Sequence, residues 1–122
     1  MKKANVAVLG ASAKTERYSN QAVCMLTEYG YNAIPVHPSG RSVNGLETLR
    51  NLSEIDLPID TLSVYVNASL SSSMQDEILK LSPRRIIFNP GTENDSLEEI
   101  CKKHNIEVEE ACTLVLLRTD SF

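Results

Sequence analysis

The sequence predicts an α/β protein with a mostly parallel sheet of about five strands and helices on both faces. Strand-like and helix-like patterns alternate along the whole chain. The strand-like segments are short apolar runs, typical of strands covered on both sides. The chain has 122 residues, of which 42% are hydrophobic and 23% charged. We therefore expect a single domain over residues 1–122 with a core of its own.

Each expected strand is an apolar run bounded by turn residues. The expected strands are residues 6–9, 33–36, 61–66, 85–88 and 106–108. Pro35 cannot donate a ladder hydrogen bond, so one side of the second strand should be short or unpaired. Residues 114–117 fit either a strand or a helical turn, because periodicity alone does not separate the two.

Apolar residues spaced three and four apart predict the helices. The expected helices lie within residues 19–30, 46–52, 69–81 and 96–104. Ser19 and Gly30 fit the caps of the first helix, and Asn67 fits the N-cap of the third. Ser96 and Glu99 fit a capping box at the start of the last.

Charge and cysteine content narrow the classes of function. The net charge is −4, which disfavours non-specific binding to nucleic acid. No apolar run approaches the roughly 20 residues that span a bilayer, and the first residues do not resemble a signal peptide. Cys24, Cys101 and Cys112 lie far apart and form no metal-ligand spacing. We expect a cytoplasmic protein with reduced thiols, no bound metal, and neither a nucleic-acid nor a membrane partner.

In parallel sheets, ligands bind beyond the carboxyl ends of the strands, so the loops that follow the strands matter most. The first loop carries Gly10, Ser12, Lys14 and Arg17 before a helix. Small residues, a hydroxyl, two cations and a helix N-terminus suit a phosphate. An ordinary turn with solvated charges fits the same residues, and the loop alone does not decide.

The second loop argues against an NAD site. The chain has no G-x-G-x-x-G, and Val36, His37 and Pro38 stand where an acidic residue would hold an unphosphorylated ribose. With Arg41 nearby, the local charge is neutral to positive, which tolerates a phosphorylated ribose. NAD(P) is therefore less favoured than other nucleotides, and His37 could equally be a loop histidine without a ligand.

The loops after the third and fourth strands contain turn formers. Asn67 could cap its helix or offer an amide to a ligand. Pro90 and Gly91 form a rigid turn whose backbone could line a pocket or simply connect two elements.

Matching stretches spread over the whole chain carry a family resemblance. They are Val6–Ser12, Arg17–Ser19, Gly30–Tyr31, Pro35–Pro38, Asp60–Thr61, Tyr65–Val66, Ile87–Glu93 and Ala111–Val115. In their order and spacing the sequence resembles the small stand-alone bacterial CoA-binding domains, which are similar to the N-terminal domain of the succinyl-CoA synthetase alpha subunit. The resemblance implies a Rossmann-like, three-layer fold that binds coenzyme A or acyl-CoA at the carboxyl edge of its sheet.

Carried over by motif, the resemblance implies a set of binding residues in four groups. Gly10, Ala11 and Ser12 would meet the pyrophosphate, with Lys14 and Arg17 nearby; Val36, His37 and Pro38 would border the adenosine; Val66 and Asn67 would line the central cleft; Asn89, Pro90, Gly91 and Thr92 would face the pantetheine arm. The chain departs from the synthetase pattern where a second glycine usually follows the serine, since it has Lys14 and Thr15 there.

The sequence assigns no catalytic residue. The synthetase's phosphohistidine belongs to a second domain that this sequence does not contain, and a free cysteine such as Cys112 is more often a buried apolar group than a nucleophile. The favoured hypothesis is a CoA-binding module without catalytic machinery. Two alternatives stay open: a subunit of an acyl-CoA enzyme completed by a ligase-like partner, and a nucleotide-sensing regulatory domain with a decayed site. Residues 114–122 could pack on the protein's own sheet or form a homodimer contact.

Overall fold

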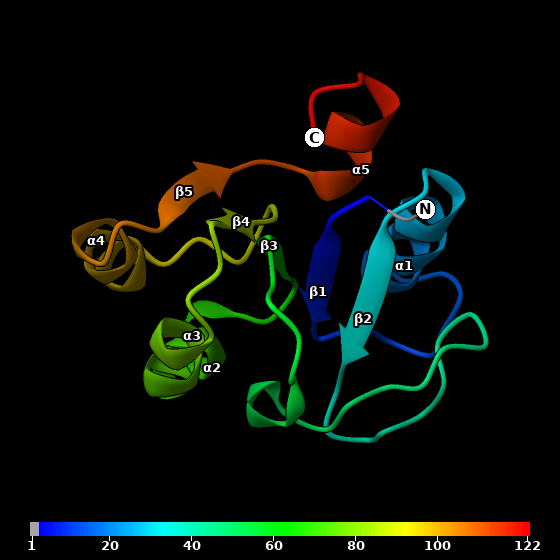
Figure 1. Cartoon of the computed structure of the whole chain (residues 1–122), viewed down its shortest axis with the longest axis horizontal. Helices are drawn as coiled ribbons and strands as arrows, with labels where there is room; N and C mark the ends of the chain where they lie inside the picture. Colours follow the sequence, from blue (N-terminus) through cyan, green and yellow to red (C-terminus); the bar gives the residue numbers. More distant parts are fainter. Residues whose placement is uncertain (1–2) are drawn as a thin grey trace.

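The computed structural model describes residues 3–122. Five parallel strands form one sheet in the order β2-β1-β3-β4-β5 (Figure 1). The strands are β1 (Asn5–Leu9), β2 (Asn32–Val36), β3 (Thr61–Val64), β4 (Arg85–Phe88) and β5 (Glu107–Glu110). The predicted Rossmann-like fold class and all five strand positions are thereby confirmed.

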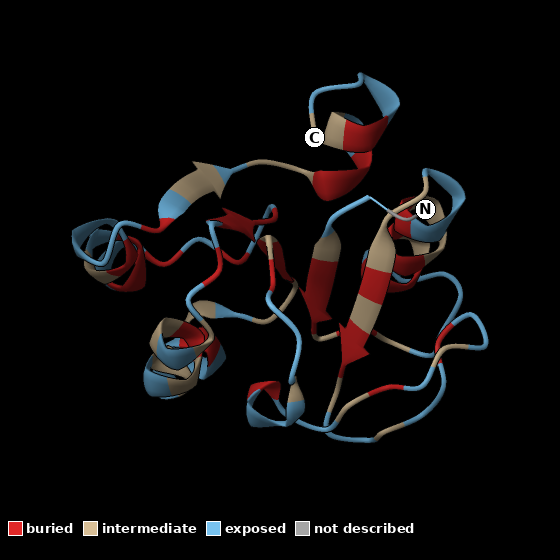
Figure 2. Ribbon diagram, in the orientation of Figure 1, coloured by how far each residue is buried: buried red, intermediate tan, exposed pale blue. Residues whose placement is uncertain are grey.

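Helices cover both faces of the sheet. They are α1 (Tyr18–Glu28), α2 (Ala68–Ser73), α3 (Gln75–Leu81), α4 (Asp95–Lys103) and α5 (Thr113–Arg118), with a 3-10 turn η1 at Leu52–Glu54. α1 packs against α5 on one face, while α3, α4 and η1 cover the other. Figure 2 shows buried residues in the sheet and on the inward sides of the helices. No helix within residues 3–122 is long and apolar enough to cross a membrane.

Alternate residues of each strand enter different cores, which explains the continuous apolar runs. In β1, Val6 and Val8 join the core beneath α1 and α5, whereas Ala7 and Leu9 join the core beneath α3 and α4. All four are at most 2% exposed. Burying a large aliphatic side chain contributes about 1.5–3 kcal/mol, so both cores stabilise the sheet.

The edge position of β2 agrees with the prediction from Pro35. This residue faces Val8 in the register of β1 and β2. On the outer side of β2 there is a single bridge between Val36 and Leu49. In it the Leu49 N–H donates to Pro35 O at 3.0 Å, and the His37 N–H donates to Leu49 O at 2.8 Å. The missing N–H of Pro35 therefore lies on the open edge, where no strand needs it.

The caps of α1 were predicted half correctly. Arg17, not Ser19, is the N-cap, and it makes no side-chain capping bond. The Ser19 hydroxyl instead accepts the Ser12 N–H at 3.0 Å, which ties the preceding loop to the helix. Gly30 follows the C-cap with φ of 92°. The Tyr31 N–H donates to Leu26 O, closing a Schellman motif that requires this left-handed glycine.

Two other helix predictions were wrong in their local detail. Residues 46–51 are not helical, because Asn44 and Gly45 turn the chain with positive φ and a bridge joins Val43 to Leu46. Of the predicted helix, Leu52 alone is helical, as the first residue of η1. The segment 69–81 is interrupted at Met74, which ends α2 and precedes α3.

At the start of α4 the capping residue is Asn94, so the capping box predicted from Ser96 and Glu99 is wrong. The Asn94 side chain accepts the Leu97 N–H at 3.2 Å. The Glu98 carboxylate in turn accepts the Asn94 N–H at 3.0 Å. Asn67 caps α2 as predicted, accepting the Leu70 N–H at 2.9 Å. The undecided segment 114–117 lies in α5.

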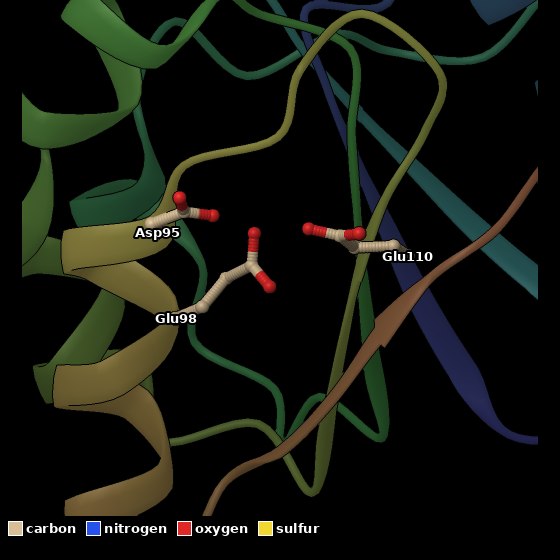
Figure 3. A group of neighbouring side chains, drawn as sticks. All are labelled: Asp95, Glu98 and Glu110. Atoms are coloured by element: carbon tan, nitrogen blue, oxygen red, sulfur yellow. The ribbon is translucent and has the colours of Figure 1, made fainter.

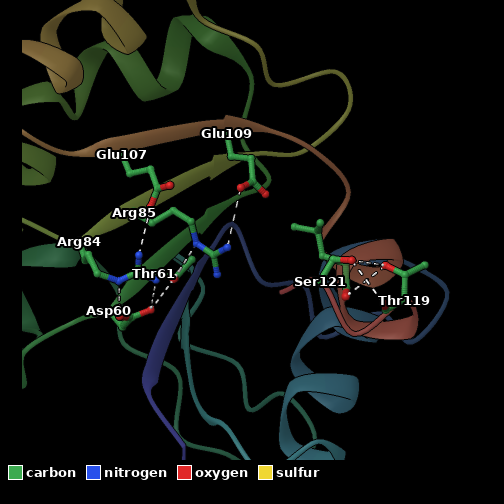
Figure 4. A network of polar contacts seen from close by, with 9 residues as sticks. Asp60, Thr61, Arg84, Arg85, Glu107, Glu109, Thr119 and Ser121 are labelled. Atoms are coloured by element: carbon green, nitrogen blue, oxygen red, sulfur yellow. Dashed lines mark hydrogen bonds and ion pairs between the residues drawn. The ribbon is translucent and has the colours of Figure 1, made fainter.

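Charged side chains at the amino ends of the strands pair with one another (Figure 4). Arg84 donates twice to Asp60, at 2.7 and 3.2 Å, and once to Glu107 at 3.0 Å. The Arg84 guanidinium lowers the pKa of Asp60 below its usual range. The charged side chains at the amino ends of the strands thus neutralise one another, unlike those described at the carboxyl ends.

Candidate functional site

Two adjoining cavities open at the carboxyl ends of β1, β2 and β3. The larger has a volume of about 610 Å³ and the smaller about 370 Å³. Gly10, His37 and Tyr65 line both cavities, and each directly follows one of the three strands. The chain passes from β1 to β2 on one side and later adds β3 on the other side. This reversal of strand order is where nucleotides bind in open α/β sheets.

Gly10 allows two strand ends to approach each other closely. Its φ is +90°, a conformation that side chains other than hydrogen rarely permit. A Cβ on this residue would lie 2.9 Å from Val66 Cγ1 and 3.3 Å from the backbone of Tyr65. Only glycine at position 10 therefore lets the loop after β1 pass directly beside the end of β3.

Several backbone N–H groups of this loop already have hydrogen-bond partners within the protein. The N–H groups of Gly10 and Ala11 both donate to Val36 O, at 2.8 and 3.1 Å. The Ser12 hydroxyl accepts the Lys14 N–H at 3.1 Å and lines the larger cavity. These N–H groups hold the turn and are already engaged, so a phosphate would rely on other donors.

The start of α1 supplies such donors. Tyr18 and Ser19, its first two residues, line the larger cavity. No side chain caps this end, and the first turn has no acidic residue. A helix N-terminus has unpaired N–H groups and a partial positive charge, which together attract an anion.

Three cations surround the same cavity. Lys14, Arg17 and Arg41 are exposed and line its wall. Within residues 3–122 none of them forms a salt bridge, and no Asp or Glu lines either cavity. In a chain of net charge −4, this is a local positive site whose charges are available to a ligand.

The residues after β2 extend the wall of the cavity. His37 Nδ1 accepts the Ser39 N–H at 3.0 Å, so a neutral His37 carries its proton on Nε2 and can donate it. Arg50 donates to Pro38 O at 2.9 Å and lines the smaller cavity. This bond fixes the loop that places His37 and Arg41 beside the site.

Tyr65 forms the wall shared by the two cavities. Its hydroxyl is buried without a hydrogen-bond partner among the described residues. Burial raises the pKa of Tyr65 to about 12, although the hydroxyls of Thr113 and Ser63 nearby act in the opposite direction. The phenol therefore stays protonated, and its ring offers a fixed apolar surface.

The loop after β4 lies outside both cavities. The Asn89 amide donates to Ser63 Oγ and Val64 O, at 3.0 and 2.9 Å, and accepts the Thr113 N–H at 2.8 Å. These bonds join β3, β4 and α5 in the interior and leave no spare donor for a ligand. Thr92 is also buried, and its hydroxyl donates to Asn89 O at 2.7 Å. Pro90 and Gly91 are exposed at the surface.

The structure brings most of the predicted site residues together. Those lining the cavities are Gly10, Ser12, Lys14, Arg17, Val36, His37, Pro38, Val66 and Asn67. Ala11 is buried beneath the loop, and the predicted residues from Asn89 to Thr92 lie apart.

Several lining residues were not predicted to belong to the site. Tyr65 was placed inside a strand running to residue 66, whereas β3 ends at Val64 and leaves Tyr65 at the strand end. Tyr18 stands beside Arg17 in a matching stretch, and that proximity is the signal that could have revealed it. Arg50 and Leu70 arrive from distant segments, and nothing in their local sequence reveals this.

The three cysteines lie outside both cavity linings. Burial raises the pKa of the Cys101 thiol, and Cys24 contacts Asn20 Oδ1 at 3.7 Å. Cys112 is partly exposed at the start of α5.

Asp95, Glu98 and Glu110 bring carboxylate oxygens within 4.8 Å of one another (Figure 3), a grouping that the sequence spacing did not suggest. Burial raises the pKa of Glu98. The Asn94 N–H opposes this rise, and the Glu110 and Asp95 carboxylates add to it. Within this group, Glu98 accepts the Asn94 N–H and so takes part in the cap of α4.

Comparison with known proteins places the chain among close structural relatives. A crystal structure of an uncharacterised protein is 38% identical, with a TM-score of 0.93 and 98% of each chain covered. Uncharacterised protein YneT of Bacillus subtilis is 26% identical over 98 residues, which is 80% of this chain and 73% of that protein.

A larger enzyme contains the same fold. Acetyl-coenzyme A synthetase 1 of Candidatus Korarchaeum cryptofilum, solved with phosphate and ADP, superimposes with a TM-score of 0.74 at 20% identity. The match covers 90% of this chain but 26% of that one, and at this identity it shows the fold alone. The model of the CoA binding domain matches residues 4–118. With nearly the whole length matched, this chain belongs to the CoA-binding domain family.

Proposed function

We propose that residues 1–122 form a single module that binds coenzyme A or acyl-CoA in the two adjoining cavities and performs no chemistry of its own. The observation that carries this proposal is the larger cavity, where Lys14, Arg17 and Arg41 have no ion-pair partner among residues 3–122 and lie beside the uncapped start of α1. A total of about 610 Å³ in this cavity is within the range of small-molecule sites.

The lining chemistry suggests how the ligand lies. The diphosphate would sit over Gly10 and Ser12, between Lys14 and Arg17, where hydroxyl, cations and helix start converge. The adenosine end would occupy the rest of the larger cavity, between the start of α1 and the loop after β2 that carries His37.

The pantetheine arm would cross the smaller cavity. Val36, Pro38, Val66 and Leu70 give this cavity an apolar wall, and Asn67 adds an amide. From there the arm would run towards the exposed turn at Pro90 and Gly91. Asn89 supports that turn from the interior.

We assign no reaction to the chain alone, because no cysteine or carboxylate lines either cavity within residues 3–122. His104 Nδ1 contacts Ile100 O at 2.9 Å at the end of α4. His37 lies at the binding site as a donor. Any reaction of the bound thiol or thioester would then use a partner, and the larger synthetases that share this fold suggest a ligase-like subunit.

Isothermal titration with CoA, acetyl-CoA, dephospho-CoA, NAD and NADP tests the proposal. We expect CoA and acetyl-CoA to bind and NAD to bind weakly or not at all. Arg17→Ala should weaken CoA binding by about 1–3 kcal/mol if the guanidinium bonds a phosphate. Arg118→Ala is the matched control, because Arg118 is an exposed arginine at the end of α5 and outside both cavity linings. No heat with CoA at millimolar concentration, together with binding of NAD, would refute the proposal.

Turnover is tested separately. The purified chain alone, with acyl-CoA and common acceptors, should show no release of free thiol. A thiol released by the chain alone and lost in Cys112→Ala would instead favour an enzyme.

A further inference from the structure

Tyr18 has an exposed ring that the fold does not use. The side chain is 70% exposed, more than any other large apolar residue in the described chain. It belongs to the first turn of α1, between Arg17 and Ser19, and all three residues line the larger cavity. No ring contact or cation–π contact involves Tyr18 within residues 3–122. The protein therefore leaves a flat aromatic surface in water at the mouth of this cavity.

Apart from the aromatic rings of His37 and Tyr65, the other side chains that line that cavity are polar or small. Its other lining residues are Gly10, Ser12, Ala13, Lys14, Arg17, Ser19, His37, Ser39, Arg41 and Tyr65. Tyr65 is partly buried and packs against the core that contains Val23 of α1 and Leu117 of α5. Tyr18, which is 70% exposed, therefore offers a flat ligand group more aromatic surface than Tyr65 does.

The charges beside Tyr18 fix where such a group would be attached. Arg17 precedes it, Lys14 lies one turn earlier in the loop, and Arg41 faces the cavity from the loop after β2. A ligand that joins a flat ring to phosphates would contact both Tyr18 and these cations. In coenzyme A that description fits the adenine, whose ribose carries one phosphate and the diphosphate, and does not fit the flexible, uncharged pantetheine.

From this placement, and resting on the proposed binding of CoA, we propose that Tyr18 is a specificity-determining residue that stacks on the adenine of the ligand. Stacking of a base on an aromatic side chain depends on the flat face and not on the phenol hydroxyl. The site therefore selects ligands with a flat base attached to phosphates, and Tyr18 sets the strength of that selection.

Substitution tests the stacking directly. Tyr18→Ala should weaken CoA binding about 5- to 150-fold, the range for losing one stacked base. Tyr18→Phe should restore most of the lost affinity, because the ring face is retained. Tyr29→Ala is the matched control. Tyr29 is an exposed tyrosine at the other end of α1 and lies outside both cavity linings.

Ligand fragments identify which part of CoA contacts the ring. Adenosine 3′,5′-bisphosphate should lose affinity for Tyr18→Ala by the same factor as CoA. Phosphopantetheine, which has no base, should bind the wild type and Tyr18→Ala equally. The opposite pattern, with the loss confined to phosphopantetheine, would overturn the stacking on adenine.

A spectroscopic signal gives a second readout. The chain has four tyrosines and no tryptophan, so tyrosine emission is observable without interference. Adenosine 3′,5′-bisphosphate should quench this emission in the wild type and in Tyr29→Phe, but to a smaller extent in Tyr18→Phe at equal saturation. Equal quenching in Tyr18→Phe would contradict contact between the two rings.

The outcomes separate this inference from the proposed function. If wild-type protein binds no CoA, the proposed function fails and the inference fails with it. If wild-type protein binds CoA and Tyr18→Ala binds it equally well, the proposed function stands and the stacking is refuted.

Discussion

Replacing Gly10 with alanine perturbs the closest approach in the binding edge of the sheet. The new Cβ would lie 2.9 Å from Val66 Cγ1 and 3.3 Å from the carbonyl carbon and oxygen of Tyr65. Valine is stiff at χ1, so Cγ1 has little freedom to move away, and the backbone of Tyr65 is fixed because its N–H donates to Leu9 O at 2.9 Å. The substitution should therefore force the loop and the end of β3 apart.

Two costs add at this position. A residue other than glycine at positive φ costs of order 1–3 kcal/mol, and overpacking a filled site typically costs about 1–3 kcal/mol more. Gly91 separates the two costs, because it has the same φ of +90° but nothing within 4 Å of an added Cβ. Gly91→Ala should show the first cost alone.

Urea unfolding followed by circular dichroism measures both variants. With an unfolding slope of about 1–3 kcal/mol per molar urea, the midpoint of Gly10→Ala should fall roughly 1 M further than that of Gly91→Ala. Gly10→Ala should also lose CoA binding at temperatures where it remains folded. Equal midpoints for the two variants would refute the reasoning, since they would show that the contact with Val66 relaxes without cost.

Three further predictions concern buried and paired polar groups. Glu98→Gln should stabilise the protein at pH 7 by a few tenths to about 1 kcal/mol, because it removes like-charge repulsion and keeps an oxygen for the Asn94 N–H. Because folding raises the pKa of Glu98, the folded protein holds a proton that the unfolded chain has released at pH values between the unfolded and the folded pKa. The gain in unfolding free energy should therefore vanish below the ordinary value of 4.5, and a gain unchanged at pH 3 would contradict this. Asp60→Asn should destabilise the protein at pH 7, because the pKa of Asp60 in the folded protein lies below its ordinary value of 3.8. In thermal melts, the difference in melting temperature between variant and wild type should disappear as the pH falls through this folded pKa. A difference that stays constant with pH would argue against the ion pair. Asn89→Ala should lower the free energy of unfolding, measured in urea, by about 2–4 kcal/mol, since it leaves the buried Thr113 N–H and Ser63 hydroxyl with fewer partners. A loss under about 1 kcal/mol would show that water replaces the amide.

The sheet was predictable because its signals are local. In β1 and β4 every residue from Val6 to Leu9 and from Ile86 to Phe88 is buried, so the requirement for apolar side chains is uninterrupted. The edge position of β2 follows from one property of Pro35, its missing donor. Such features are visible in a few adjacent residues, and tertiary contacts reinforce them.

The segment between β2 and β3 was mispredicted for the opposite reason. Its leucines resemble a helix, but Val43 is fully buried and Leu49 bridges Val36. Contacts with residues distant in sequence, such as the bridge between Leu49 and Val36, hold this segment against the outer side of β2. Helical spacing among three leucines cannot compete with an Asn-Gly turn that reverses the chain.

At the candidate site, the sequence indicated where residues lie better than what they do. Strand-end position identified Gly10, Lys14, Arg17 and His37, because parallel strands bring their carboxyl ends to one edge. The same rule selected Asn89, whose amide is consumed by an interior network linking three elements. Burial and hydrogen-bond partners distinguish these cases, and both depend on the folded chain.

The charged side chains at the amino ends of the strands are paired, whereas among residues 3–122 those that line the cavity at the carboxyl ends are not, and this difference affects the affinity for an anionic ligand. At the amino edge, Arg84 already has two carboxylates as partners, so an anion arriving there would gain little. At the carboxyl edge, Lys14, Arg17 and Arg41 have none among the described residues. They line one cavity that has no acidic side chain in its described wall, and a diphosphate would form charge-assisted bonds with them. The carboxyl end of the sheet can therefore attract a polyanion although the whole chain is acidic.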